Sequence, residues 1–164
     1  MDRTPYPTDL TDAQWKLIGP YVPKPKPGGR PAKYSRREVV NGILYQTRNG
    51  GGWRALPHDL SPYWIVFHYF RAWQKDGTWD RIHDALREKT RRHAGKKPKP
   101  TAVILDSQSV KTTAQGGRRG EKKITAASVL NRSRRLRKDY ERTVESSEAF
   151  VKVAMIYLMT RRLR

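Results

Sequence analysis

Hydrophobic residues recur at helical spacing in four segments of the first 95 residues. Each segment opens with a serine or threonine that can accept a hydrogen bond from a free amide of the first turn. The segments end near 19–20, 49–52, 76–77 and 95, where glycines interrupt the pattern. The sequence therefore predicts four helices. Their predicted N-caps are Thr11, Ser35, Ser61 and Thr78, with Gln14 and Glu38 completing capping boxes for the first two.

The third predicted helix, from Ser61 to Lys75, is rich in aromatic residues. An aromatic stripe at helical spacing belongs to a core more often than to a contact surface. We therefore expect Trp64 and Phe67 to pack inward together with the other large apolar side chains of this segment. The side chains expected to pack beside them are Val66, Phe70 and Trp73.

The chain changes character after residue 95. The segment 96–100 is a basic, proline-rich linker, and the apolar, β-branched run 101–105 predicts a short strand that ends at Asp106. This strand could form a hairpin with 109–113. Helical patterns follow at about 126–142 and 146–162. The second has an apolar stripe that we expect to dock only loosely, through Phe150, Val153 and Tyr157.

The charge of the chain points to a polyanionic partner. Its 164 residues include 35 Lys and Arg against 15 Asp and Glu, a net charge of +20, which favours binding to nucleic acid. A ribosomal-type protein and a merely solvated basic surface are the alternatives. The absence of cysteine excludes disulfides and thiolate chemistry. No stretch has the length of a membrane span, so we expect a cytoplasmic, nucleoid-associated protein without a membrane partner.

Two successive helices, the second aromatic and basic, suit a helix-turn-helix unit whose second helix enters the major groove of DNA. The sequence predicts that Tyr63, His68, Arg71 and Gln74 face the bases. A second set of cations around the start of the preceding helix would bind phosphates. These predicted phosphate ligands are Arg30, Lys33, Arg36 and Arg37, of which Arg30 could instead enter the minor groove. The four histidines lack the paired spacing of a zinc site.

Several motifs resemble the insertion sequence five family of bacterial transposases. They are LTDAQW at 10–15, GGRP at 28–31, WRALP at 53–57 and DSQSVKTT at 106–113, followed by RRLRKDYER at 134–142 and ESSEAF at 145–150. The resemblance implies an N-terminal helical domain that binds the terminal inverted repeats of the element. It also implies a ribonuclease-H-like domain in which two aspartates and a glutamate hold two Mg²⁺ ions for attack on DNA. Asp106 matches the first of these aspartates and is the expected metal ligand.

The rest of that triad has no counterpart here. No residue matches the second aspartate, and the place of the glutamate falls at about 124–125, where the chain has Ile and Thr. Glu121 is the nearest acidic residue, in a stretch rich in Gly, Lys and Arg that gives it no fixed direction. A lone carboxylate cannot hold two Mg²⁺ ions against their hydration. We therefore expect no productively bound Mg²⁺.

The expected fold class is mainly α. A helix-turn-helix-type domain (1–95) and a linker (96–100) precede a truncated remnant of an RNase H-like α/β domain (101–164), made of a short β hairpin and two C-terminal helices. The predicted function is binding to double-stranded DNA at terminal inverted repeats without strand cleavage. A homodimer or the intact transposase is a candidate partner. The alternatives are an active transposase completed by a dimer or a second polypeptide, a transcriptional regulator, and an RNA-binding protein.

Overall fold

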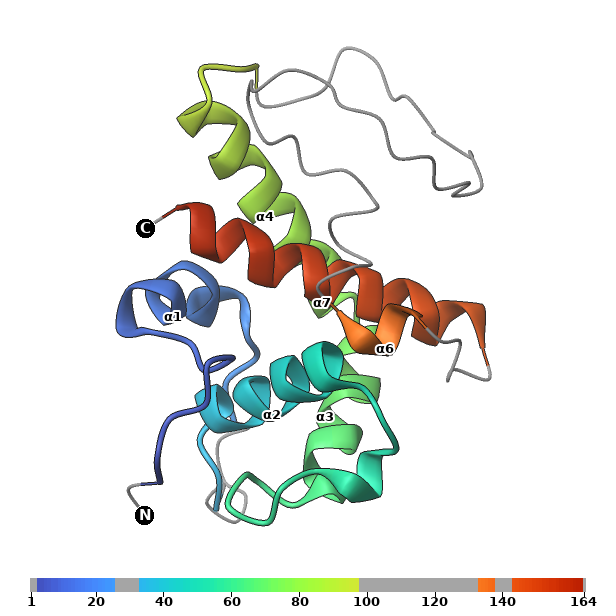
Figure 1. The fold of residues 1–164 in the computed structure, drawn as a ribbon. Coiled ribbons are helices and arrows are strands. Elements are labelled where there is room, and N and C mark those ends of the chain that lie inside the picture. Colours follow the sequence, from blue (N-terminus) through green and yellow to red (C-terminus); the bar gives the residue numbers. More distant parts are fainter. Residues whose placement is uncertain (1–2, 26–32, 98–132, 138–142, 164) are drawn as a thin grey trace, which may run out of the picture.

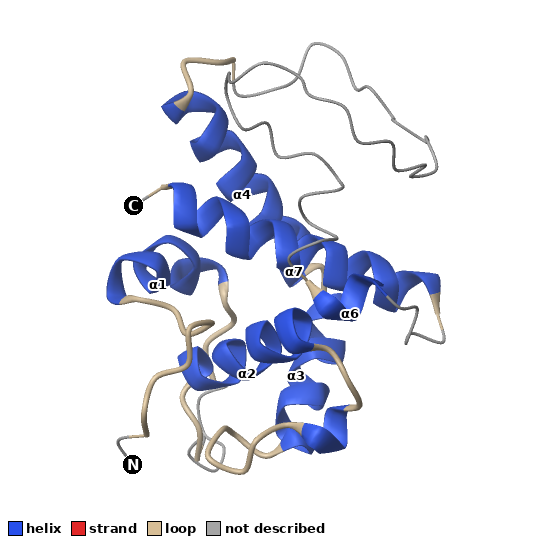
Figure 2. Cartoon of the chain, viewed as in Figure 1, coloured by secondary structure: helices blue, strands red, loops and turns tan. Residues whose placement is uncertain are grey.

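The computed structural model of the chain describes residues 3–25, 33–97, 133–137 and 143–163 (Figures 1 and 2). Within these ranges the regular elements are all helical, which confirms the mainly α class. The predicted linker, strand and hairpin of 96–113 lie outside the described residues from position 98 onward. The helices are α1 (Asp12–Ile18), α2 (Arg36–Asn49), α3 (Tyr63–Lys75), α4 (Thr78–His93), α6 (Arg134–Arg137) and α7 (Val144–Arg162), with 3₁₀ turns η1 (Gly19–Tyr21) and η2 (Trp53–Ala55).

The first two helices begin as their caps predict. Thr11 accepts a hydrogen bond from the Gln14 amide at 3.3 Å, and the Gln14 side chain accepts one from the Thr11 amide at 2.9 Å. The Ser35 hydroxyl accepts from the Glu38 amide at 3.2 Å. The second bond of a capping box would run from the Ser35 amide to the Glu38 side chain. The Glu38 carboxylate instead accepts hydrogen bonds from Asn41 and Arg3.

The predicted caps of the next two helices are wrong. The N-cap of α3 is Pro62 rather than Ser61, which is buried. The N-cap of α4 is Gly77, whose φ of 71° lies in the left-handed region that favours glycine. Thr78 is the first helical residue, and both its amide and its hydroxyl donate to one carboxylate oxygen of Asp76, at 2.9 and 2.6 Å. An aspartate two residues upstream therefore takes over the role expected of the threonine.

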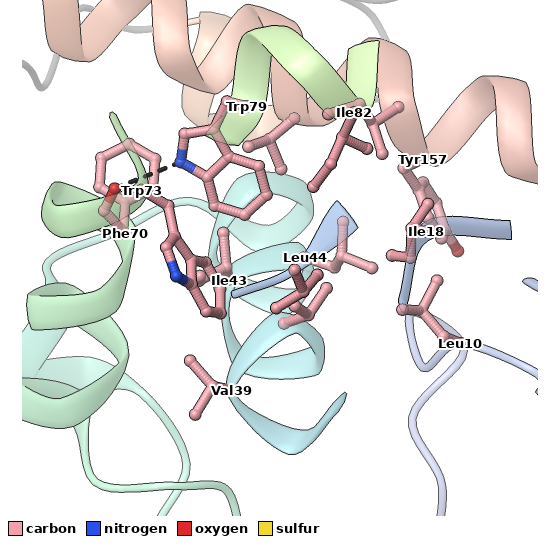
Figure 3. Close-up of a cluster of buried hydrophobic side chains, with 14 of the residues drawn as sticks. Leu10, Ile18, Val39, Ile43, Leu44, Phe70, Trp73, Trp79, Ile82 and Tyr157 are labelled. Atoms are coloured by element: carbon pink, nitrogen blue, oxygen red, sulfur yellow. Dashed lines mark hydrogen bonds between the residues drawn. The ribbon is translucent and has the colours of Figure 1, made fainter. Parts of the chain in front are cut away.

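The core gathers large apolar side chains from α2, α3, α4 and the N-terminal segment (Figure 3). Trp79 is 2% exposed, and its indole N–H donates to the Phe70 carbonyl at 3.2 Å, the bond drawn as a dashed line. Trp73 meets Trp79 edge to face, with ring centroids 5.4 Å apart. These aromatic contacts link α3 to α4 across their two-residue connection.

The C-terminal helix α7 belongs to the same core. It crosses between α4 and α2 in Figure 1, and Phe150 and Val153 are completely buried. The Phe150 ring stacks on Phe70 with centroids 4.4 Å apart. The Tyr157 hydroxyl donates to the Pro7 carbonyl at 2.9 Å. The expected loose docking is therefore wrong, because α7 is apolar on more than one stripe and packs on α4 and α2 at once.

Polar contacts add to this docking. Lys152 of α7 forms an ion pair with Asp80 of α4 at 2.6 Å. Arg135, which is 4% exposed, places its guanidinium over the rings of Trp53 and Phe150 and donates to the Gly51 carbonyl. Residues 133–163, where described, thus pack against the helices of the first 97 residues.

His83 of α4 is partly buried. Burial lowers the pKa of this imidazole, although the neighbouring Asp84 carboxylate acts in the opposite direction.

No helix in the described ranges is long and apolar enough to cross a membrane.

The position of Phe150 predicts a large effect on stability. Phe150→Ala should lower the free energy of unfolding by about 3–5 kcal/mol, because it leaves a cavity against Phe70. Val151→Ala is the matched control on the same helix, since Val151 is exposed, and should change the free energy by less than about 0.5 kcal/mol. Urea unfolding followed by circular dichroism measures both. Equal small effects would contradict a shared core.

Candidate nucleic-acid interface

Helix α3 exposes aromatic side chains to solvent. Trp64 is 61% exposed and Phe67 42%, so the prediction that both pack inward is wrong. The buried side is made by Val66, Phe70 and Trp73, as predicted. Trp64 lies on the opposite side of the helix, and Phe67 lies at the boundary, where it contacts the Trp53 ring at 5.3 Å and stays open to water. Tyr63 and His68, two of the predicted base-facing residues, are exposed as expected.

The other two predicted base-facing residues are less exposed. Arg71 is half-buried and donates to the Ser146 hydroxyl of α7 at 3.1 Å. Gln74 is also half-buried, and its side-chain oxygen is buried without a hydrogen-bond partner. Helix α7 therefore restricts the C-terminal half of this face. We define the α3 face as the exposed side chains Tyr63, Trp64, Phe67 and His68.

The predicted phosphate ligands separate into different groups. The Arg36 guanidinium lies over the Tyr69 ring at 4.1 Å and donates to the Pro23 carbonyl at 3.2 Å. Arg37 pairs with Asp12 at 2.6 Å and also donates to the Leu10 carbonyl. Both arginines therefore bind segments that precede α2 and fix the start of this helix against them.

Lys33 is exposed, with its ammonium 5.6 Å from the centre of the Tyr34 ring. Arg30 lies outside the described residues. Of the three predicted phosphate ligands that the structure describes, Lys33 is the one that is exposed to solvent.

A groove of about 180 Å³ runs beside the α3 face. On one side it is lined by successive turns of α3, and on the other by the residues that lead into α2. Tyr69 is fixed in this groove, because Arg36 covers its ring and Trp73 contacts it at 5.3 Å. The lining residues are Lys33, Tyr34, Trp64, Ile65, His68 and Tyr69.

The charges around the α3 face are positive and unneutralised. Helix α3 has no Asp or Glu. Lys33, Arg54 and Lys75 have no carboxylate within ion-pairing distance in the part of the chain that the structure describes. Three arginines of α4 differ, because each pairs with an acidic residue three to five positions before it. The pairs on or beside α4 are Arg81–Asp76, Arg87–Asp84 and Arg92–Glu88.

Sequence reasoning missed Trp64, Phe67, Tyr34, Tyr69, Arg54 and Lys75 as members or neighbours of this surface. The spacing held a signal for Trp64, which lies four residues before His68 and seven before Arg71, on the side already predicted to be exposed. No signal in the sequence could place Tyr34 in the same groove as Tyr69, because this placement depends on how α2 packs against α3.

A magnesium site cannot be built from the described residues. Asp106, Glu121, Asp139 and Glu141 lie outside them, and no group of three His, Asp or Glu residues within them could hold a metal ion. Glu145 and Glu148 are described and both are exposed on α7.

Residues 10–83 match a family model described as "Putative transposase of IS4/5 family (DUF4096)". The matched segment contains the whole α3 face. The helical module is therefore similar to a transposase family over most of its described length.

Two relatives are also similar to this chain, one of them over a longer stretch. A Burkholderia cepacia protein named "Insertion element IS402 uncharacterized 16.2 kDa protein" is 32% identical over 120 residues, 68% of this chain and 79% of the relative. "Uncharacterized protein y4sN" of Sinorhizobium fredii (strain NBRC 101917 / NGR234) is 33% identical over 73 residues, 44% of this chain and 58% of the relative. No solved structure matches the chain. The chain belongs to the IS4/5 family of transposase-related insertion-sequence proteins.

The contacts of the arginines predict that Arg36 and Lys33 differ in their effect on folding. Arg36→Ala should lower the free energy of unfolding by about 1–2 kcal/mol, because it removes the contact with Tyr69 and the bond to Pro23. Lys33→Ala removes the same charge from an exposed position and should stay within about 0.5 kcal/mol of the wild type. Chemical unfolding compares the two variants. An unchanged stability for Arg36→Ala would show that its guanidinium is free to serve another role.

Proposed function

We propose that this chain binds double-stranded DNA at the terminal inverted repeats of an insertion element, with α3 as the recognition helix of a helix-turn-helix-type module. One observation carries the proposal: the exposed side of α3 joins aromatic side chains and His68 to cations that pair with no carboxylate among the described residues. DNA supplies the missing negative charge, and release of its counterions drives binding. The match of 10–83 to a transposase family supports the same ligand.

The residues divide by the part of DNA they would contact. His68 and Trp64 lie on the exposed side of α3, where they would reach base edges in the major groove. Lys33 enters from the segment before α2, Arg54 from η2, and Lys75 from the last turn of α3. These three cations would bind phosphates on the two sides of the DNA major groove and set the orientation of α3. Arg71 would contribute only after release from Ser146.

We further propose that this chain does not cleave DNA. Two-metal phosphoryl transfer needs several carboxylates around the scissile phosphate, and the sequence offers Asp106 without matches for the other two. A chain that occupies the repeats without cutting them would compete with the intact transposase for its substrate. Inhibition by occupancy follows from mass action and requires no contact between the two proteins.

The α3 assignment predicts different effects for three variants. His68→Ala should weaken binding to the element end by about 1–3 kcal/mol, because it removes a base contact. The affinity of this variant for a random duplex should stay nearly unchanged. Lys33→Ala should weaken both duplexes alike and reduce the salt dependence by about one counterion. Lys89→Ala removes a cation from an exposed position of α4 and is the matched control, with little effect on either.

Fluorescence anisotropy at two salt concentrations measures these affinities, with a structured RNA as a third ligand. Equal losses for Lys33→Ala and Lys89→Ala would reject the α3 face. Tighter binding to RNA than to either duplex would favour the RNA-binding alternative, and binding without preference for element ends would favour a general regulator.

A second candidate function is a transposase subunit completed by another polypeptide. The observation that favours it is the small size of one relative. The Burkholderia cepacia insertion-element protein has a mass of only 16.2 kDa. A short chain in such an element is therefore not unique to this sequence. In this hypothesis the missing carboxylates come from a partner, and Asp106 supplies one ligand.

A cleavage assay separates the two functions. The purified chain is incubated with Mg²⁺ and a supercoiled plasmid that carries the element ends. We expect no nicking by the wild type beyond that of Asp106→Asn, because one carboxylate is too few to hold the metal pair. Nicking that appears only when a product of the neighbouring reading frame is added, and that Asp106→Asn abolishes, would establish the second function.

A further inference from the structure

We propose that the groove beside the α3 face binds a single unstacked nucleobase of DNA. The inference rests on the proposed DNA binding and deepens it, since it names a distorted or unpaired DNA site as the preferred ligand. The groove is lined by Lys33, Tyr34, Trp64, Ile65, His68 and Tyr69, and its volume is about 180 Å³.

The chemistry of the lining suits a base. Three of the six lining residues are aromatic rings that a base can stack on, and stacking accepts any base because each has a π-face. His68 provides ring nitrogens for a hydrogen bond to a base edge. Lys33 lies at the same groove with its charge exposed, where it can bind the phosphate attached to that base. None of the described lining residues is acidic, so none of them would repel the phosphate.

The groove is also adjacent to the surface proposed for the duplex. Trp64 and His68 belong both to the α3 face and to the groove lining, one turn apart on the helix. A duplex lying on the α3 face would therefore have one strand beside the groove. A base that leaves the stack there would lie next to the groove.

Part of the groove wall is fixed before any ligand binds. Tyr69 is held by the guanidinium of Arg36 at 4.1 Å and by Trp73 at 5.3 Å, and the His68 ring contacts it edge to face at 5.4 Å. Fixed rings lose little conformational entropy when a base stacks on them. Trp64, at 61% exposed, has much of its surface open and would be covered by the base.

The charge balance favours a nucleobase over an apolar protein segment as the occupant. The chain carries a net charge of +20, and neither α3 nor the described lining of the groove includes a carboxylate. An apolar peptide would cover the rings and leave Lys33 unneutralised. A nucleotide covers the rings and neutralises that charge at the same time.

The test compares the full chain on two short duplexes of the same sequence, one fully paired and one with a single unpaired thymine. We expect roughly tenfold tighter binding to the bulged duplex, and we expect Trp64→Leu to remove this preference because it keeps apolar bulk but loses the flat ring. Trp64→Phe should retain most of it. Tyr63→Ala is the matched control, an exposed aromatic of the same helix outside the groove, and should leave the ratio of affinities unchanged.

The outcomes separate this inference from the proposed function. Equal affinity for the two duplexes would overturn the groove as a base site while leaving DNA binding by α3 intact. A preference that survives Trp64→Leu would overturn it as well, because the base would then bind elsewhere. Failure to bind either duplex would overturn both proposals. Unchanged circular dichroism of each variant establishes that the comparison is between folded proteins.

Discussion

The burial of α7 against α3 and α4 is the contact on which the rest of this structure depends. Phe150 stacks on Phe70, and Arg135 covers Phe150 and Trp53 from the other side. Without α7 these aromatic rings would be exposed to water, and a small helical module has few other apolar groups to replace the lost burial. The same helix determines which part of α3 stays open, because Ser146 binds Arg71 while Trp64, Phe67 and His68 remain exposed. The stability of the fold and the position of the candidate interface thus have one origin.

The local signals in the sequence predict the helices well and their packing poorly. Thr11 and Ser35 cap their helices as expected, because a cap depends only on residues within one turn. The cap of α4 was misassigned, since Asp76 competes for the same amide from two residues upstream. The docking of α7 could not be read from its pattern, because its partners lie more than 70 residues away in the sequence and a stripe does not show which surface it will meet.

The sequence predicts the candidate site only in part, because it contains local signals and does not show the packing. His68, Tyr63 and Lys33 are exposed as the sequence predicts. Arg36 and Arg37 are predicted to bind phosphate from their charge and their position at the start of α2, and in the structure they contact Tyr69 and Asp12. Trp64 was assigned to the core because large aromatics usually lie there, although its position on the helix is opposite Phe70. Its exposure is the feature that most changes the view of the surface, since it turns a basic helix into one that can also stack on bases.

Binding of DNA by the α3 face is the central claim, and hydrogen–deuterium exchange of the full chain with and without an element-end duplex tests it most directly. The account predicts that the duplex slows exchange in 63–69 and in the residues just after 33, with little change in the last turn of α4 at 91–93. Protection confined to that basic end of α4, with α3 unchanged, would contradict it.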